Sequence, residues 1–504
     1  MSWPLHYPPL VRAYLDAAPQ LAGFYSQAPR TANWPALMQA AQLDATGRQR
    51  LVQVLRAQHT GAPAPVQQQI DSLLLPTTFT LTTGQQAGLA GGPLYTWYKA
   101  ISTLKWAQQL NSQYPDYHVV PLFWVASEDH DADEVNHYWH GYHDRRSYGG
   151  HIQGPVGRHH TVAALLPDMP AVWKQYWQEQ PTWGQAFRHL LQDLLGPYGM
   201  LVLDTDDRQL KEAFAPIMRA ELLDGAAAQP LQQQTEALQA LGYHPQLHIR
   251  PLNLFYQQPG LRSRLERQGD TFRLVETGQR LSRTDLERLL AETPEALSPN
   301  AALRPLYQQC ILPNLAYIGG NAELAYWLQL RPMFDQFGIA YPLLLPRLQA
   351  LAILPAQQEQ LRLLGLGLQE VLLPLHQLRQ LLLPAVYNTE ALHDQLNQMA
   401  LQYEALDKLV AGTGQDKTVA SAQRRFVQWA RRLQARVGQQ QLQGYAPYHQ
   451  ARRLQDQIQP AGLTQERVLA LPALGGNPHE RIAQMMQALV PSAEKMQIWE
   501  LQAP

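Results

Sequence analysis

The sequence predicts an α/β protein with a doubly wound core, joined to a region of long antiparallel helices. A strand-like segment, Thr77–Thr82, is followed by a loop with four glycines, a helical segment at about 94–110 and a continuous apolar run, Val119–Ala126. Strand, glycine loop, helix and strand in this order form the βαβ unit of a doubly wound sheet. From about residue 355 to 459 glutamine, leucine and arginine dominate, and apolar residues recur at spacings of three and four. That spacing is typical of helices packed along a coiled-coil seam.

Length and composition limit the classes of protein to consider. The chain has 504 residues, of which 45% are hydrophobic and 16% charged, as in a globular protein with two or three structural units. The formal net charge of −1 leaves no surplus of positive charge for a phosphate backbone, so we expect no nucleic-acid partner. No apolar run approaches the roughly 18–20 residues that span a bilayer, and the start of the chain lacks a signal-peptide pattern. With a single cysteine, Cys310, no internal disulfide can form, and we expect a cytoplasmic protein without membrane contact.

Further segments surround the βαβ unit. Met200–Leu203 and Ala340–Leu345 are predicted strands, and short strands such as Phe272–Glu276 lie beside polar helices in a stretch that we interpret as an insertion. Asn477 followed by Pro478 indicates the start of a late helix. We expect six segments: N-terminal helices of the core at 1–75, the first part of the core at 76–240, an inserted connecting segment at 241–300, the second part of the core at 301–354, an antiparallel helical coiled coil at 355–462, and a C-terminal segment at 463–504.

The glycine-rich loop Gly84–Pro93 is the first candidate ligand site. Because it follows a strand and opens a helix, backbone amides at the helix start are unpaired and the helix dipole favours an anion. The loop lacks both the GKS or GKT ending of a Walker loop and the GxGxxG pattern, and the alternative is a tight turn without a ligand. The candidate substrate-binding residues are Gly84, Gln85, Gln86, Gly88, Gly91, Tyr95 and Lys99, of which Lys99 could reach back to a carboxylate or phosphate.

A cluster of acidic residues follows the buried strand Val119–Ala126 and is the second candidate site. Ligands of open α/β sheets bind beyond the carboxyl ends of strands, and crowded carboxylates raise one another's pKa values. Three interpretations remain open: a divalent metal site, recognition of a substrate ammonium with general-base catalysis, or a solvated loop that caps the next helix. No zinc-like spacing occurs, so we assign no metal. The candidate catalytic residues are Glu128, Asp129, His130 and Asp131, and Ser127, Asp133 and Asn136 are candidates for substrate binding.

The segment Ser298–Leu330 is the third candidate. Arg304 and Tyr307 lie three residues apart on one helix face, and an apolar run ends at a glycine turn before another helix. Asn321 could cap that helix, with Glu323 in its first turn. Arg304 and Asn321 are therefore further candidates for substrate binding, and the alternative is simple packing. Cys310 lies among apolar residues with no histidine near it in sequence, so we expect a core residue and no nucleophile.

These three segments together resemble the bacillithiol biosynthesis cysteine-adding enzymes. The resemblance lies in TGQQAGLAGGPLYTWYKA, VVPLFWVASEDHDADEVNH and SPNAALRPLYQQCILPNLAYIGGNAELAYWLQL, and the opening YLDAAPQLAGFY is also similar. It implies a Rossmann-like core with inserted connecting segments and an α-helical coiled-coil region, a nucleotide-binding pocket, and often a dimer. The implied reaction joins cysteine to the amine of glucosaminyl malate in the last step of bacillithiol synthesis. Asn321 departs from the commoner family pattern, which has a glycine there, and the departure bears on close approach to the backbone at this point.

Reaction chemistry leads to a hypothesis about roles. Amide formation from a free carboxylate is uphill in water, so we infer ATP as the energy source, although the sequence shows no ATP motif. By charge matching, the glycine loop and Lys99 hold malate carboxylates or a phosphate, while Glu128, Asp129 and Asp131 hold the ammonium. His130 or one of these acids removes the proton from the attacking amine.

Two other functions remain open from the sequence. One is an α/β transferase that acts on a nucleotide or sugar substrate, and the other is a non-enzymatic assembly protein whose coiled coil is the working part. The coiled coil either forms a homodimer or closes over the core. Its arginines could face a nucleotide phosphate or a solvated surface; they are Arg424, Arg425, Arg431, Arg432 and Arg436.

Overall fold

The computed structural model describes residues 2–387 and 389–502, which form two compact units. The first unit is the α/β part, residues 2–352 together with 465–502, and the second is helical, residues 353–464. The predicted coiled coil at 355–462 lies within the second unit. In the part of the chain that the structure describes, no helix combines the length and apolar character that crossing a bilayer requires.

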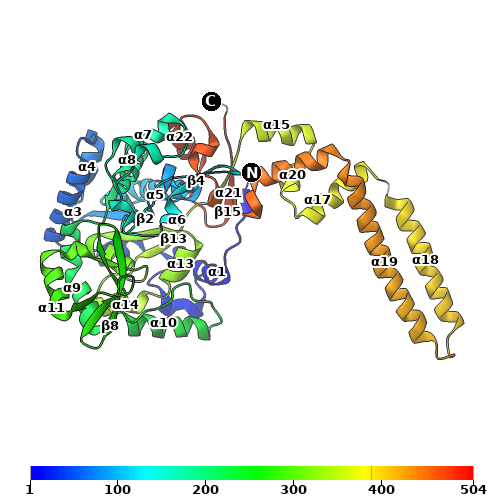
Figure 1. The fold of residues 1–504 in the computed structure, drawn as a ribbon, viewed down its shortest axis with the longest axis horizontal. Helices are drawn as coiled ribbons and strands as arrows, with labels where there is room; N and C mark the ends of the chain where they lie inside the picture. The colour runs from blue at the N-terminus through cyan, green and yellow to red at the C-terminus, as the bar shows by residue number, and fades with distance from the viewer. Residues whose placement is uncertain (1, 388, 503–504) are drawn as a thin grey trace. The chain divides into compact units, whose positions relative to one another are not determined.

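A sheet of five parallel strands forms the centre of the α/β unit (Figure 1). Its order is β13–β12–β2–β3–β6. The chain forms the central strand β2 first, adds β3 and β6 on one side of it, and later adds β12 and β13 on the other side. The direction of building therefore reverses between β2 and β12, which is where doubly wound sheets bind ligands. The strands are β2 (Thr78–Gln85), β3 (His118–Val125), β6 (Leu201–Asp204), β12 (Asn314–Gly319) and β13 (Leu343–Pro346).

The four predicted strands all exist, with shifted ends. The first continues to Gln85, three residues beyond the prediction, and the last begins at Leu343 instead of Ala340. The continuous apolar run of β3 follows from burial on both faces. On β3, Val120, Leu122 and Trp124 lie in one hydrophobic cluster and Val119 in another.

Helices cover both faces of this sheet. One face packs against α1 (Pro9–Leu15), α3 (Ala45–Gln58), α9 (Arg208–Asp224) and α12 (Arg304–Ile311), whose apolar side chains share a cluster with β6. The other face packs against α2 (Trp34–Ala40) and α5 (Leu94–Gln113). The remaining helices of this unit are α4 (Ala64–Ser72), α6 (Ala132–Val135), α7 (Ala171–Glu179), α8 (Trp183–Leu195), α10 (Ala228–Ala240), α11 (Arg283–Glu292), α13 (Asn321–Trp327), α14 (Arg331–Phe337), α21 (Gln465–Val468) and α22 (Pro478–Ala488).

The predicted insertion is a separate antiparallel sheet of five strands in the order β10–β9–β8–β7–β11. The hairpin turns contain Gly260 and Gly269, whose positive φ angles of 77° and 60° suit glycine. The strands are β7 (Leu254–Gln258), β8 (Leu261–Gln268), β9 (Thr271–Leu274), β10 (Arg280–Ser282) and β11 (Leu297–Pro299).

Two small sheets were not predicted. One pairs β1 (Ser2–Pro4), β15 (Lys495–Glu500) and β14 (Ala350–Ile353), and the other is the hairpin of β4 (His137–Gly141) and β5 (Asp144–Ser147). The first shows that the C-terminal segment completes the α/β unit. In the same segment α22 begins at Pro478, and the Asn477 side chain accepts the amide of His479 at 2.9 Å, which confirms the predicted helix start.

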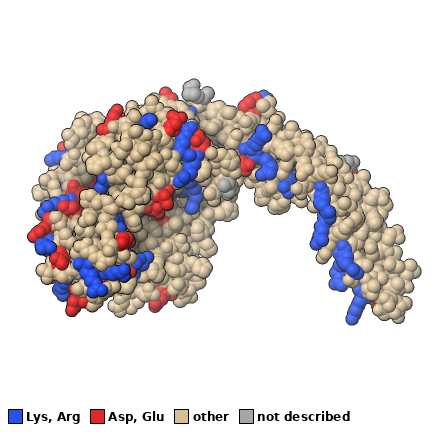
Figure 2. Space-filling model, viewed as in Figure 1, with Lys and Arg blue, Asp and Glu red and all other residues tan. Residues whose placement is uncertain are grey.

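The helical unit is a coiled-coil hairpin with shorter helices at its base, as predicted. α18 (Thr389–Leu409) and α19 (Asp416–Gln443) run side by side (Figure 1), with Leu396, Phe426 and Ala430 buried between them. Basic side chains gather along one edge of the hairpin (Figure 2). The shorter helices are α15 (Pro355–Leu364), α16 (Leu368–Val371), α17 (Leu375–Leu382) and α20 (Ala446–Ile458).

A candidate active site at the carboxyl edge of the core sheet

Four loops meet at the carboxyl edge of the core sheet, because parallel strands end on the same side. The glycine loop follows β2, the acidic cluster follows β3, Thr205–Asp207 follows β6 and Gly320 follows β12. The three segments singled out from the sequence are therefore neighbours in space, on either side of the reversal between β2 and β12.

Lys99 occupies the position between β2 and β12. Its ammonium donates to the carbonyl of Gly84 at 2.7 Å, to Oε1 of Gln85 at 3.0 Å and to Oε2 of Glu323 at 2.6 Å. Glu323 also accepts the hydroxyl of Tyr317 and the amide of Gly320. Burial lowers the pKa of Lys99, against the attraction of Glu323. Lys99 does reach back along its helix to a carboxylate, but all three of its donors are used by the protein itself.

The glycines of the loop serve the turn. A side chain on Gly91, at φ 85°, would overlap the indole of Trp97, and one on Gly88 would lie 2.8 Å from the Cα of Gly92. The first amide of α5, that of Leu94, donates to the carbonyl of Leu469 at 2.8 Å. This geometry matches the alternative of a tight turn, and it disfavours the anion-binding role predicted for Gly88 and Gly91.

Gln85 and Gln86 are better placed to meet a ligand. The Gln85 amide donates to the hydroxyl of Tyr95 at 3.3 Å, and burial raises the pKa of Tyr95 to about 12, so the phenol is neutral. The Gln86 amide donates to Oδ2 of Asp129 at 2.6 Å and to Oε2 of Glu134 at 2.8 Å. Two carboxylates are thus held by one amide. Glu134 was not among the candidates selected from the sequence.

Within the acidic cluster, Glu128 is set apart by burial. Its carboxylate pairs with the ammonium of Lys211, which is fully buried, and accepts the Gln257 amide at 3.3 Å. Lys211 also donates to the carbonyl of Leu297 at 3.2 Å. Burial raises the pKa of Glu128 and Lys211 opposes that rise. Since Gln257 and Leu297 belong to the inserted sheet, this pair joins the insertion to the core.

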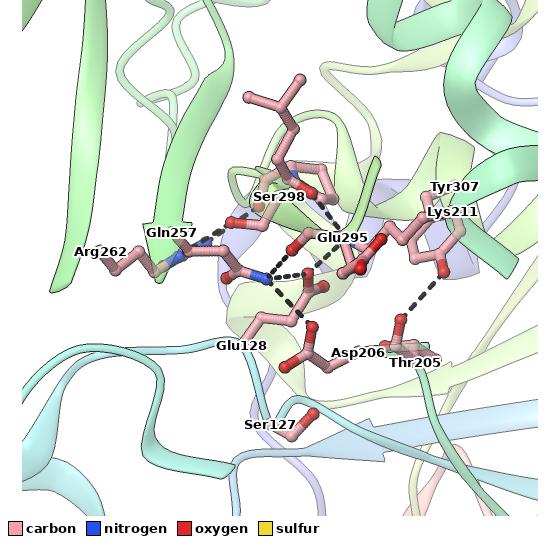
Figure 3. Close-up of polar contacts among 12 residues, drawn as sticks. Ser127, Glu128, Thr205, Asp206, Lys211, Gln257, Arg262, Glu295, Ser298 and Tyr307 are labelled. Carbon is pink, nitrogen blue, oxygen red and sulfur yellow. Dashed lines mark hydrogen bonds and ion pairs between the residues drawn. The ribbon is translucent and has the colours of Figure 1, made fainter. Parts of the chain in front are cut away.

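Asp206 extends the same network on the far side of Glu128. Figure 3 shows the amide of Gln257 directed at both carboxylates, and its distance to Oδ1 of Asp206 is 3.0 Å. Arg158 binds Asp206 through two hydrogen bonds of 2.6 and 2.7 Å. Each acid of this pair therefore has its own cation, which is what buried charges require.

The remaining members of the cluster have local roles. Asp131 is exposed and accepts the amide of Glu134 at 3.3 Å, so it caps the short helix α6. Asp133 is exposed in that helix, and Asn136 ends it. The hydroxyl of Ser127 donates to Asp204. The interpretation as a solvated capping loop thus describes Asp131 and Asp133, but not Glu128 or Asp129.

His130 is held from the inserted sheet. Nη1 of Arg262 lies 2.9 Å from Nδ1 of His130, while other donors of the same guanidinium bind Oγ of Ser298 and the carbonyl of Pro299, both at 3.1 Å. The guanidinium also stacks on Phe255, 4.1 Å from the ring centre. Sequence reasoning missed Arg262 because 132 residues separate it from His130 and its strand gave no ligand signal.

Arg304 is the first residue of α12 and lies near both Lys99 and Glu323. It sits over the rings of Trp124 and Tyr317, at 5.6 and 5.5 Å, and donates to Oε1 of Gln308 at 3.1 Å and to the hydroxyl of Tyr326 at 3.5 Å. Among the described residues, the ion pairs include none for Arg304. Arg304 thus has N–H donors left for a ligand, and the neighbouring aromatic rings stabilise its positive charge.

Two expectations in this segment have different outcomes. The prediction that Asn321 caps α13 is wrong: Gly320 is the capping residue, Asn321 is the first helical residue, and Glu323 lies in the first turn as expected. The cap is a backbone amide bound by Glu323, which needs no side chain at residue 320. Burial raises the pKa of Cys310 to about 11, which fits a core thiol and argues against a nucleophile. Within residues 2–387 and 389–502 no group of three histidine, cysteine or acidic side chains has a metal-binding arrangement.

Comparisons with known proteins agree with this fold. Residues 3–348 match the bacillithiol biosynthesis BshC N-terminal Rossmann-like domain, and residues 350–501 match the BshC C-terminal coiled-coil domain. The second match runs through residues that the structure places in the α/β unit, since 465–502 pack there.

Relatives with the name "Putative cysteine ligase BshC" are similar over most of the chain. The protein of Cytophaga hutchinsonii is 36% identical over 66% of this chain and 65% of its own length, and that of Flavobacterium johnsoniae is 34% identical over 68% of each. The Flavobacterium psychrophilum protein is 32% identical over 83% of this chain and 82% of its own length. With both domains matched in order, this chain belongs to the bacillithiol biosynthesis BshC family.

Proposed function

We propose that this chain is a ligase that joins the carboxyl group of L-cysteine to the amine of glucosaminyl malate, in the last step of bacillithiol biosynthesis. The observation that carries the proposal is the family match over both domains, with relatives named as cysteine ligases. Such a reaction brings an amine together with carboxylate-bearing substrates. Its site therefore needs anionic groups that bind the amine and cationic groups that bind the carboxylates. The carboxyl edge of the core sheet offers both.

Asp129 and Glu134 are the proposed amine-binding groups. The Gln86 amide holds both, and their negative charges favour an ammonium. Burial raises the pKa of Glu134, which makes its carboxylate a better acceptor for the amine proton. Of the predicted catalytic residues, Asp129 and His130 keep a role in this proposal. Glu128 is instead a buried positioning group, and Asp131 is a helix cap.

Arg304, with Tyr95 and Asn321 near the same edge, is proposed to bind the malate carboxylates. Its planar guanidinium can donate two parallel hydrogen bonds to a carboxylate. The neutral phenol of Tyr95 accepts a bond from Gln85 and keeps its own proton for a ligand oxygen. Lys99, whose donors are all used, is proposed to position β2 and α13 around these groups and to make no contact with substrate.

Activation of the cysteine carboxyl is required, because an amide does not form spontaneously from a carboxylate and an amine in water. We propose that ATP supplies this energy. The glycine loop does not fit a nucleotide phosphate, since Leu94 already donates to Leu469 and Gly91 packs on Trp97. The loop therefore has no part in the proposed activation.

The test is an assay of purified protein with glucosaminyl malate, L-cysteine and ATP, with and without Mg²⁺, by mass spectrometry of the thiol product. We expect bacillithiol to form with matching consumption of ATP. Release of ADP or of AMP would identify the activated intermediate. Absence of product, with no ATP turnover, would overturn the ligase proposal; product formation from a nucleotide sugar without cysteine would instead support a transferase.

A substitution of Asp129 tests the amine site. Asp129→Asn keeps the shape of the side chain but removes the charge that attracts the ammonium. We expect turnover to fall by about 100-fold, the lower range for loss of an acid–base group. Asp116→Asn is the matched control, because Asp116 is exposed just before the amino end of β3, at the opposite edge of the sheet. Equal rates for the two variants would remove the carboxylate pair from the mechanism.

A further inference from the structure

The contact between Arg262 and His130 determines which ring nitrogen of His130 carries the proton. A guanidinium has N–H donors only and stays charged at any pH that the protein tolerates. Nδ1 of His130, at 2.9 Å from Nη1, must therefore accept, so it carries no proton. A neutral imidazole with a bare Nδ1 has its proton on Nε2. The inserted sheet thus selects one tautomer of a histidine that the core supplies.

Protonation of His130 is opposed by the same contact. An imidazolium would place an N–H donor against the Arg262 donor, with two positive charges in contact. The acids that face the ring are Asp129, Asp131 and Glu276, and the nearest approach is Oδ1 of Asp129, 3.7 Å from Nδ1. That separation exceeds a hydrogen bond. Burial and Arg262 outweigh these acids and lower the pKa of His130.

We infer that His130 acts as a neutral hydrogen-bond donor through Nε2, and that Arg262 is the positioning residue that fixes its tautomer. The role in catalysis rests on the proposed function, whereas the tautomer does not. The partner that suits an Nε2–H donor is an oxygen that carries or gains negative charge, such as the carbonyl oxygen of the acyl group under attack by the amine.

A consequence follows for the proton of the attacking amine. Nδ1 of His130 is engaged by Arg262 and Nε2 already carries a proton, so the ring has no free lone pair for a substrate. The amine nitrogen forms the new bond to the acyl carbon, and the bond from that carbon to the oxygen activated by ATP breaks, so that phosphate or AMP leaves with the electron pair. The amine proton passes to a carboxylate. Asp129 and Glu134, under the Gln86 amide, are the acceptors in reach of this edge. The expectation that His130 is a general base is thereby replaced.

Nuclear magnetic resonance of the full chain, with its histidines labelled with ¹⁵N, tests the tautomer without any substrate. The His130 signals are identified by their loss in His130→Gln. At pH 7 we expect a protonated Nε2, an unprotonated Nδ1, and titration below the ordinary range of histidine. In Arg262→Met the pKa should rise and the second tautomer should appear, and Arg262→Lys should restore part of the shift. A protonated Nδ1 in the unaltered protein would overturn the inference.

Kinetics test the donor role. His130→Gln keeps an N–H donor near the place of Nε2 but cannot act as a base. His130→Ala can neither donate a hydrogen bond nor act as a base. We expect about a 100-fold loss of turnover for His130→Ala and less than about a tenfold loss for His130→Gln. His143→Gln is the control, because His143 is exposed in the turn between β4 and β5.

The outcomes distinguish the tautomer of His130 from its role in catalysis. Equal losses for His130→Gln and His130→Ala would overturn the donor role even if bacillithiol is made. If the unaltered protein makes no bacillithiol, the proposed function and the catalytic part of this inference fail together, while the resonance result still decides the tautomer. Thermal melting of the Arg262 variants shows whether the bonds to Ser298 and Pro299 are needed for folding.

Discussion

Lys99 and Arg304 show how two basic residues at one edge can differ in role. Lys99 donates to a carbonyl, an amide oxygen and a carboxylate, and these contacts hold β2 against α13. Arg304 keeps free donors and rests on aromatic rings. From the sequence Lys99 was the stronger candidate, because it follows a glycine loop. The number of unused donors, which only the structure reveals, reverses the order.

His59 provides a pH-dependent prediction. Nδ1 donates to the carbonyl of Leu55 at 2.9 Å and Nε2 accepts the amide of Val202 at 3.2 Å, so the buried ring is held neutral. Burial lowers its pKa to about 4, from 6.5. Because the folded pKa is the lower one, this stabilisation is full above pH 6.5 and is lost as pH falls toward 4. It amounts to about 3 kcal/mol.

The measurement compares urea unfolding of the unaltered protein and His59→Gln from pH 7 to pH 4.5, by tryptophan fluorescence. The variant should be less stable at pH 7 but should lose less stability on acidification. His143→Gln, which alters an exposed ring, should follow the unaltered protein. Parallel curves for all three proteins would show that His59 does not titrate below its ordinary range.

Much of the candidate site was visible in the sequence as two motifs. Asp129, Gln86 and Tyr95 lie in segments that follow strands, and that position alone places them at one edge. Arg262 and Lys211 were not predicted, since each meets its partner across a long stretch of chain and lies in a segment with no sequence signal. Tertiary packing sets such pairings, and local patterns do not report them.

Among the elements, the core strands could be predicted and the small sheets could not. A strand buried on both faces leaves a continuous apolar run, and this run is enough to identify β3 in the sequence. β1 and β14 are three or four residues long and pair with β15 near the other end of the chain. Strands of this length leave no periodicity to detect.

The junction between the inserted sheet and the core depends on the pair Lys211–Glu128. Lys211→Met leaves a buried carboxylate without a cation, which destabilises the fold by about 3–5 kcal/mol. Adding Glu128→Gln removes the stranded charge, so the double variant should recover most of that loss. Urea unfolding followed by tryptophan fluorescence measures both. Equal stability for Lys211→Met and the unaltered protein would show that the pair does not hold the junction.

At the scale of the whole molecule, the helical hairpin presents an apolar stripe. Met399, Leu406 and Leu409 recur along one side of α18 with 48%, 45% and 80% exposure, and Trp429 on α19 is 47% exposed. The acids Glu404 and Asp407 lie on α18, whereas the charged residues from 424 to 436 are all arginines. A second copy that packs α18 against α19 would bury the stripe and pair the charges. We therefore propose a homodimer through the hairpin.

Light scattering of the purified protein tests this assembly. We expect a dimer for the unaltered chain and a monomer for the double variant Met399→Gln with Leu406→Gln, because both lose apolar contact area. Leu74→Gln with Leu75→Gln is the control, since these leucines are exposed in the α/β unit. A monomeric unaltered protein would contradict the proposal, and a variant that stays dimeric would place the interface elsewhere.

The return of the chain at Gln465 has a consequence for how this architecture can change. The amide of Gln465 binds both the N–H and the carbonyl of Ala352 at 2.9 Å, so the points where the helical unit leaves and re-enters are adjacent. Beside them, Arg347 and Glu466 form a buried ion pair. A C-terminal extension would be joined to the α/β unit at one point, whereas the helical unit is an insertion joined to it at both ends. It can therefore lengthen, shorten or be exchanged by recombination without a new end being exposed in the α/β unit.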